Sequence, residues 1–468
     1  MGKSTTAKSP TSTSFLKAVP LHQLQRALKW ALDTKLFAEL CVHGNTKWAV
    51  PELVMLALFW VWSECTTLTR AFTQASQLCQ TLLGKVVLKS YQGFTGALTT
   101  WTPKLMPLLW VQLQERMEKI GDVHWRIGLW LPLAVDGSRT TTPRTLKNEK
   151  ALNSPTFGKG KKAKSRKKWK NKRRRSKPLS APVHPQIWLT LLWHMGLKMP
   201  WAWKCGPSNS SERQHLMDLI ETLKFPEKTL FCGDAGFVGY ELWQKLAQSH
   251  HFFLRVGANV HLLRRLGTIR LRGDLVHFWP KLAAEKNKPP MLLRLLKFQT
   301  GRCPMFAVTN ILDDCDLTPE QAKSLYQKRW GIEVQFRSLK QTFGRGKLQS
   351  RTPERAYMEL EWSLLGLWMI QLLTVSEQIP AGIEPEQSSV SVALQVFQDA
   401  MWGGATMCLR KKLREAVKDS YTRKTSKKAR YRPAKKDKPS AGKTVIKNAT
   451  SEQKRRYRRI MAKNQKNP

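Results

Sequence analysis

The chain has 468 residues, of which 41% are hydrophobic, and it contains 19 tryptophans. This content can build at least one sizeable core, which excludes a chain that is disordered throughout. Because 80 Lys and Arg stand against 33 Asp and Glu, the formal net charge is +47. Such a surface attracts polyanions, and we expect nucleic acid as the partner rather than an anionic membrane surface.

Export and membrane insertion are not expected. The segment Met1–Pro20 has no apolar core after its lysines, so no secretory signal is predicted. Two apolar runs, Trp48–Trp62 and Trp362–Val375, are shorter than the roughly 20 residues that cross a bilayer, and we interpret both as buried helices. The cysteines show no C-x-x-C pair, which favours reduced thiols, no zinc site and a cytoplasmic protein. They are Cys41, Cys65, Cys79, Cys205, Cys232, Cys303, Cys315 and Cys408.

The first 125 residues are predicted to form a helical region. Apolar residues recur at three-to-four spacing from residue 14 to about residue 120. Pro20, Pro51 and Pro103 are expected near helix starts. This pattern carries no chemistry by itself.

A different pattern begins near Arg126. The apolar run "IGLWLPLAVDGSRT" predicts a buried strand that delivers Asp136 at its end. A basic loop is predicted next, over residues 146–178. Lys or Arg fills 12 of the 17 positions from 161 to 177 and none is acidic, so this loop cannot bury enough apolar surface to fold alone.

The rest of the chain repeats the same arrangement and then changes. A helix from about Ser211 to Leu223 precedes "KTLFCGDAGF", a short strand that ends at Asp234. Residues 251–312 are predicted to be mostly β. A helix should start with Thr318 as N-cap and Pro319 at its first position. Residues 409–468 form a basic tail that we expect to be largely disordered.

Four functional side chains are predicted to share one helix face. At about 100° per residue, the side chains of Tyr326, Arg329, Glu333 and Lys340 fall within about 60° of one another. A solvated face with incidental charge is the simpler interpretation of any basic helix. Flanking apolar residues such as Trp330 and Phe336 would nevertheless anchor this helix, so its polar face need not be free solvent.

Three carboxylates could form one metal site. Asp136 and Asp234 both follow apolar runs, where an unpaired charge is costly. Together with Glu333 they offer the hard oxygen ligands that Mg²⁺ prefers, and Mn²⁺ may take the same place. Two ions about 4 Å apart can stabilise both the attacking and the leaving oxygen in phosphodiester displacement.

The spacing Y-x2-R-x3-E-x6-K of Tyr326, Arg329, Glu333 and Lys340 resembles the signature of the DDE transposases of the insertion-sequence-four family. The segments "AVDGS" and "CGDAGF" are similar to that family's two catalytic aspartate motifs. The resemblance covers about residues 130–375.

The resemblance implies an α/β fold with a ribonuclease-H-like mixed sheet flanked by helices. The catalytic domain would span residues 126–408, with a mostly β insertion at about 251–312, between a DNA-end-binding region (1–125) and the tail (409–468). Asp136, Asp234 and Glu333 would be both catalytic residues and ligands of two Mg²⁺ ions. Tyr326, Arg329 and Lys340 would contact phosphates near the cleaved end, and Trp279 is our candidate for stacking a flipped base.

The implied activity is cut-and-paste transposition of an insertion sequence through a hairpin intermediate. The partners would be double-stranded DNA, as element ends and as target, with a dimer in the synaptic complex and a nucleoid-associated location. Three alternatives stay open: a non-catalytic nucleic-acid-binding protein, a ribonuclease-H-like nuclease without strand transfer, and a degenerate copy. The basic loop is either a DNA-gripping arm or a non-specific solvated loop; in either case DNA affinity should depend steeply on salt.

Overall fold

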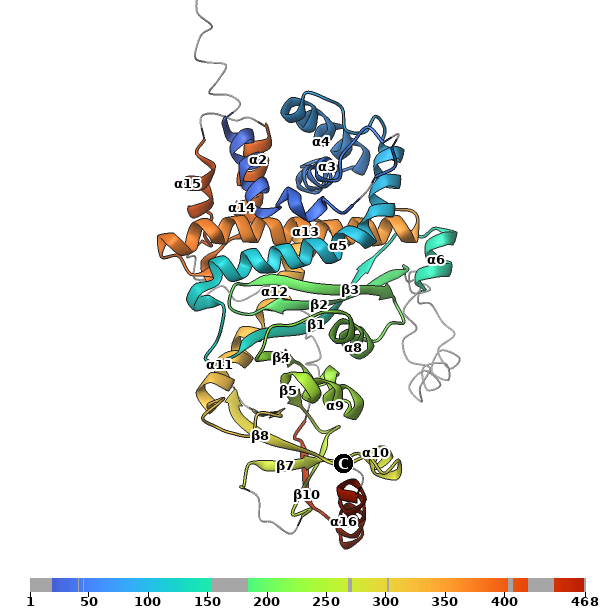
Figure 1. The fold of residues 1–468 in the computed structure, drawn as a ribbon, viewed down its shortest axis with the longest axis vertical. Helices are drawn as coiled ribbons and strands as arrows, with labels where there is room; N and C mark the ends of the chain where they lie inside the picture. Colours follow the sequence, from blue (N-terminus) through green and yellow to red (C-terminus); the bar gives the residue numbers. More distant parts are fainter. Residues whose placement is uncertain are drawn as a thin grey trace, which may run out of the picture.

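The computed structural model describes residues 19–40, 42–44, 46–153, 184–267, 272–300, 303–402, 407–419 and 442–466. A helical region precedes a large mixed sheet, and further helices follow it (Figure 1). The basic run at 161–177 lies outside the described residues. Among the described residues, no helix is both long and apolar enough to cross a bilayer.

The N-terminal part is helical, as predicted. It consists of α2 (Val19–Ala31), η1 (Thr34–Phe37), α3 (Val50–Trp62), α4 (Leu68–Leu83), α5 (Tyr91–Gly121) and η2 (Asp122–His124). Pro20 and Pro51 lie at helix starts, whereas Pro103 lies inside α5, where the prediction of a boundary is wrong. The helix continues past Pro103 because its buried side chains, such as Leu98 and Leu105, pack into the core on both sides of the proline.

The described strands form one 10-stranded sheet in the order β10-β6-β7-β8-β9-β5-β4-β1-β2-β3. Strands β1, β4 and β5 run parallel to one another, β10 runs parallel to β6, and the other neighbours are antiparallel. The strands are β1 (Leu131–Thr141), β2 (Gln186–His194), β3 (Met199–Pro207), β4 (Thr229–Gly233), β5 (His251–Val256), β6 (His261–Arg264), β7 (Leu275–Phe278), β8 (Met291–Thr300), β9 (Cys303–Thr309) and β10 (Val445–Asn448).

Helices cover this sheet and link it to the N-terminal region (Figure 1). They are α6 (Leu146–Leu152), α8 (Glu212–Thr222), η3 (Ala235–Phe237), α9 (Tyr240–Ser249), α10 (Lys281–Glu285), α11 (Pro319–Arg329), α12 (Gly331–Arg337), η4 (Ser338–Thr342), α13 (Pro353–Gln378), η5 (Ile379–Ala381), η6 (Pro385–Gln387), α14 (Val390–Trp402), α15 (Leu409–Arg414) and α16 (Ser451–Lys466). The expected mixed α/β architecture with a helical N-terminal region is confirmed.

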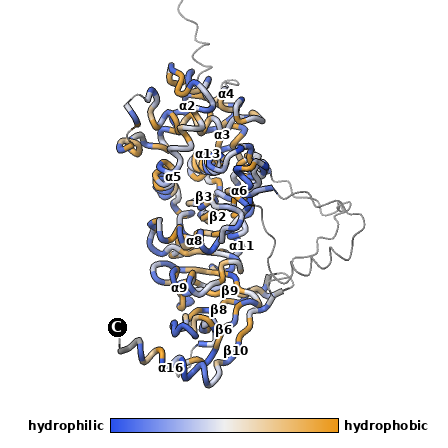
Figure 2. The backbone as a smooth tube through the Cα atoms, turned by 90° about the vertical axis from the view of Figure 1, so that its right-hand side faces the viewer, coloured by the Kyte–Doolittle hydropathy of each residue, from blue (hydrophilic) through white to orange (hydrophobic). Residues whose placement is uncertain are grey.

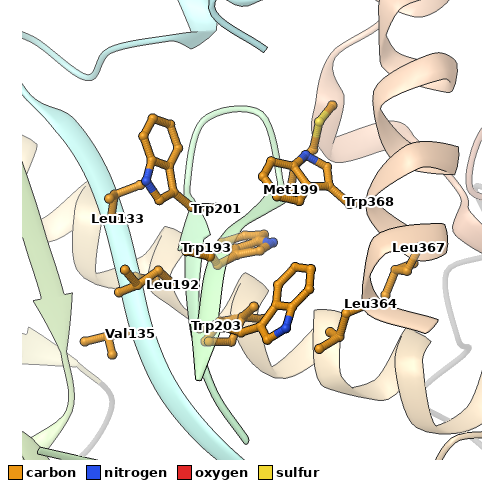
Figure 3. Packing of buried hydrophobic residues seen from close by; sticks show 14 of the residues in the cluster. Leu133, Val135, Leu192, Trp193, Met199, Trp201, Trp203, Leu364, Leu367 and Trp368 are labelled. Carbon is orange, nitrogen blue, oxygen red and sulfur yellow. The ribbon is translucent and has the colours of Figure 1, made fainter. Parts of the chain in front are cut away.

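Helix α13 joins the two parts of the molecule. It is buried nearly all round, because it packs on β3 on one side and on α3 and α5 on the other. Trp203 of β3 meets Trp368 with ring centroids 6.3 Å apart (Figure 3). On the opposite side, the Trp62 indole donates to the Gly366 carbonyl at 3.1 Å. A helix that is apolar on every face belongs in a core, so this segment is the predicted buried helix.

Several sequence-based expectations need correction. Asp136 lies within β1 and not at its end, because the strand continues to Thr141 through pairing with β2. Residues 146–152 form helix α6, which Thr145 caps through a hydrogen bond from the Asn148 N–H, so they are not part of a loop. The prediction that residues 251–312 are mostly β needs no such change, because strands β5–β9 lie there and belong to the same sheet as β1 and β4.

The basic tail is not largely disordered in its described parts. Residues 409–414 form α15 and residues 445–448 form β10, which finds backbone partners along β6. Helix α16 follows. Residues 420–441 of this tail lie outside the described residues.

We predict that Gly366→Val lowers the free energy of unfolding by about 1–3 kcal/mol, because overpacking a core strains its neighbours. A Cβ at Gly366 would lie 2.7 Å from Cγ1 of Val61 on α3. Urea denaturation measures the change. The control is Gly96→Val in α5, where no atom lies within 4 Å of the added Cβ, and its effect should stay near 0.5 kcal/mol or less. Equal losses in both variants would contradict this account of α13.

Candidate active site

Strand register brings the two aspartates together. Ala134 of β1 pairs with Cys232 of β4 in parallel register. Asp136 stands two residues further along β1, and Asp234 directly follows the last residue of β4, so the pairing of the strands sets the two carboxylates near each other. The prediction that each apolar run delivers a carboxylate to a common place therefore follows from the pairing of these strands.

Both aspartates are held by backbone N–H groups. Oδ1 of Asp136 accepts from the Gly137 N–H at 2.8 Å, and Oδ1 of Asp234 accepts from the Gly236 N–H at 2.7 Å. Burial raises the pKa of Asp136 to about 6; the Gly137 hydrogen bond opposes the shift, and the charges of Asp234 and Glu333 add to it. The three predicted carboxylates thus influence one another electrostatically.

The helix that carries Glu333 is interrupted, which corrects the prediction of one continuous stripe. Thr318 and Gln321 form a capping box at the start of α11, with Pro319 at the first position as predicted. Helix α11 ends at Arg329, and α12 begins at Gly331.

The break occurs where the helix packs most closely on the sheet. A Cβ at Gly331 would lie 2.1 Å from the Trp193 ring of β2, so glycine lets the backbone approach there. The π-helical turn η4 then shifts Lys340 from its expected angle.

Two of the predicted phosphate-binding side chains point into the same region. Arg329 is 7% exposed, with its guanidinium Nη2 3.9 Å from Glu333 Oε1 and its charge close enough to lower the pKa of Asp136. Lys340 Nζ donates to Ser138 Oγ at 2.6 Å, two residues after Asp136 on β1. Tyr326 stacks under Arg329, with the guanidinium carbon 5.6 Å from the ring centroid.

A fourth carboxylate, missed by the sequence analysis, reaches this end of the sheet. Glu212, the first residue of α8, lies so near Gly137 that a Cβ there would be 2.5 Å from its Oε1. A Cβ at Gly236 would lie 3.6 Å from its Oε2. Glu212 thus occupies space left by Gly137 of the first aspartate motif, and that glycine was the signal that could have indicated a close approach there.

The environment of Glu212 resembles that of Asp136. Burial raises the pKa of Glu212 to about 7, with Asp136 and Asp234 adding to the shift while Arg139 and Arg213 oppose it. Four carboxylates therefore share one region in which each disfavours the ionisation of another.

The structure does not support the base-stacking prediction for Trp279. Its side chain is 5% exposed, and its indole N–H donates to the Lys288 carbonyl at 2.9 Å. The exposed tryptophan nearest the signature in sequence is Trp330, at 56% exposure, in the break between α11 and α12. Residue type alone does not distinguish an exposed ring from a buried one, and that is why the choice of Trp279 failed to find an exposed ring.

The donor set fits a divalent cation of the Mg²⁺ type. Carboxylate oxygens are the ligands such ions prefer, and a bound cation would stabilise the ionised form of Asp136, whose pKa is raised by burial and, to a smaller extent, by the charges of Asp234 and Glu333. Within the described residues, the ligand atoms of Asp136, Asp234 and Glu333 do not all lie within 4.8 Å of one another; the group that does is the exposed set Asp313, Asp314 and Cys315.

We predict that Asp136→Asn stabilises the metal-free protein at high pH but not at low pH. Because the pKa of Asp136 is higher in the folded state than in the unfolded state, protonation of this side chain stabilises the folded wild-type protein. This contribution is fully present below about pH 4 and is lost as the pH rises through about 6. The free energy of unfolding of the variant, relative to wild type, should rise by up to about 3 kcal/mol between pH 4 and pH 8. Urea denaturation in a chelator measures this difference; a difference that does not change with pH would contradict the proposed crowding of charge.

Comparison with known proteins identifies the family of this chain. The family model described as "Transposase DDE domain" matches residues 131–369, which begin with β1 and end within α13. The curated protein "Transposase InsG for insertion sequence element IS4" of Escherichia coli (strain K12) is 28% identical over 283 residues. That match spans 57% of this chain and 57% of the relative, so less than two thirds of the relative is represented.

A solved structure, described as the piggyBac transposase synaptic complex with hairpin DNA, covers 89% of each chain with a TM-score of 0.36 and 10% identity. A likeness at that level carries no argument about function. The family model, in contrast, spans over half of the 468 residues and contains Asp136, Asp234 and Glu333. The chain therefore belongs to the family of the transposase DDE domain.

Proposed function

We propose that the chain is a DNA transposase that cuts and rejoins the ends of an insertion sequence by metal-dependent phosphodiester chemistry. The proposal is carried by the pairing of β1 with β4, which sets Asp136 near Asp234, and by the charges of Asp234 and Glu333 that act on Asp136, inside the region that the family model matches. Such a set of carboxylates is suited to bind Mg²⁺ or Mn²⁺.

In this proposal the three carboxylates hold the metal ions from two elements of the fold, the sheet and α12. A pair of divalent ions, when bound, would stabilise charge on the attacking and leaving oxygens of the phosphodiester. Asp136 and Asp234 would hold the ions from the sheet, and Glu333 would hold them from α12. The raised pKa of Asp136 favours a binding site that loads its cations more readily as the pH rises past 6.

The cations nearby would position DNA. Arg329 and Lys340 lie on the side of the carboxylates that α11, α12 and η4 form, where both can reach phosphate oxygens. Tyr326 supports the Arg329 guanidinium by stacking. We further propose that the N-terminal helices bind the terminal inverted repeats, that two copies join two ends, and that cleavage proceeds through a hairpin.

Substitution of the carboxylates tests the site. Asp136→Ala, Asp234→Ala and Glu333→Ala should each abolish cleavage of a duplex that contains the element end, because each removes a ligand of the proposed ions. The assay is gel analysis of end-labelled DNA with Mg²⁺ or Mn²⁺. Asp399→Asn, exposed on α14, is the matched control and should cleave like wild type. Full cleavage by any of the three alanine variants would refute its assignment.

Product analysis separates the proposed transposase from the remaining alternatives. A transposase joins the freed 3′ ends to a target plasmid, whereas a nuclease of the same fold leaves unjoined ends. A non-catalytic binding protein, which the net charge of +47 would also suit, shows neither product at any end sequence. Joined products that require all three carboxylates are the expected result.

Direct measurement of metal binding gives an independent test. Mn²⁺ should raise the thermal midpoint of the wild-type protein, since a ligand that binds only the folded state stabilises it. The gain should be larger at pH 8 than at pH 5.5, because Asp136 is protonated below its pKa of about 6. Asp136→Asn with Asp234→Asn should lose the gain. An equal gain in this double variant would place the bound ion elsewhere, for example at Asp313 and Asp314.

A further inference from the structure

A groove of about 1120 Å³ opens next to the start of α8 and is not used by the chemistry proposed above. One wall is formed by α9, β7 and α10, and the other by β10 and the start of α16. The bottom of Figure 1 shows α10 and α16 close together, and Figure 2 shows β10 and α16 at the same end of the molecule.

The C-terminal segment that builds the second wall is firmly attached. Strand β10 pairs in parallel with β6 over four residues, from Val445 opposite His261 to Asn448 opposite Arg264. Beyond the strand, the Tyr457 ring contacts the His277 ring at a centroid distance of 6.2 Å, and Ile460 is 5% exposed. Backbone pairing and apolar burial therefore fix α16 against the sheet.

Basic side chains outnumber acidic ones in the lining of the groove. The basic side chains in the lining are those of Lys281, Lys286, Lys288, Lys447, Arg456 and Arg213. The acidic ones are those of Glu241, Glu285 and Glu452. Two ion pairs, Lys281 with Glu285 and Lys288 with Glu241, neutralise part of this charge. In the described residues, Lys447 and Arg456 form no ion pair, and exposed arginines on α16 extend the basic surface. Such a lining is complementary to a polyanion.

The groove begins at the catalytic end of the sheet. Ser211 and Arg213, which line it, flank Glu212, whose carboxylate lies beside Gly137 and Gly236. The Arg213 guanidinium donates to the Val238 carbonyl at 2.8 Å, which fixes the loop after Asp234. A chain of phosphates that reaches Asp136 and Asp234 can therefore continue into the groove.

Its aromatic residues cannot stack on bases. Tyr240, Phe278 and Trp279 line the groove, yet their exposed fractions are only 8%, 5% and 5%. Stacking of a base requires a free ring face. Contacts in this groove are therefore made with the backbone of a nucleic acid rather than with its bases.

We propose that this groove binds the phosphate backbone of duplex DNA next to the cleaved position, with α16 as its outer clamp, and does so without reading sequence. The proposal rests on the proposed function, because it takes DNA as the substrate of the carboxylates. It assigns the C-terminal residues 445–460 a direct role in holding DNA.

Salt-dependent binding tests the proposal. Each phosphate contact that is lost lowers the slope of log K against log salt concentration by about 0.9, so Lys447→Ala with Arg456→Ala should lower it by about 2. The loss should be equal for an element-end duplex and a random duplex of the same length. Affinities of the full chain for both duplexes, measured by fluorescence anisotropy at four salt concentrations, give these slopes.

Two further variants complete the design. Lys119→Ala with Lys224→Ala removes the same charge from exposed positions that precede β1 and β4, and this control should keep the wild-type slope. Glu285→Gln frees Lys281 and should tighten binding, an effect that loss of folding cannot mimic.

The possible outcomes separate the two proposals. If wild type binds neither duplex, both the groove and the proposed function are overturned. If wild type binds and the groove variant keeps its slope, or weakens only the element-end duplex, the groove proposal alone is overturned. An equal loss in the Lys119 and Lys224 control would also overturn it, because the effect would then be one of net charge.

Discussion

The parallel pairing of β1 with β4 is the constraint on which the candidate site depends. These strands come from segments about 100 residues apart, and their register sets Asp136 beside Asp234. A shift of one residue would send one aspartate to the opposite face, because strand side chains alternate. The register is secured by side chains that are wholly buried on both faces, such as Leu133, Ala134 and Phe231. Apolar packing in the core thus fixes the position of the polar chemistry.

The other side chains of the site come from helices that pack against this pair of strands. Helix α12 packs against β1 and carries Glu333, while α8 brings Glu212 into the space beside Gly137. Burial raises the pKa values of Asp136 and Glu212, and the charges of neighbouring carboxylates add to both shifts. Without a metal ion, burial and neighbouring negative charge both disfavour the ionised carboxylates. The site should therefore bind a cation in preference to a neutral ligand.

The sequence predicted the parts of the fold that depend on local pattern. The run of apolar residues before Asp136 and Asp234 gave the strands, and Thr318 with Pro319 gave the start of α11, because capping chemistry is local. It could not predict the break at Trp330, which results from the close approach of Gly331 to Trp193 on a distant strand. Glu212 was missed for a similar reason, since only the folded chain brings α8 over Gly137. Trp279 was chosen by residue type, and type does not determine exposure.

The attachment of β10 has a consequence for solubility. Strand β6 would otherwise be the last strand on its side of the sheet, with a row of unpaired N–H and C=O groups open to another chain. The C-terminal segment takes that place itself and presents a four-residue strand bearing the charged side chain of Lys447 to the outside. Short edge strands with charged side chains disfavour pairing between molecules. The residues that form one wall of the basic groove therefore also protect the sheet edge from aggregation.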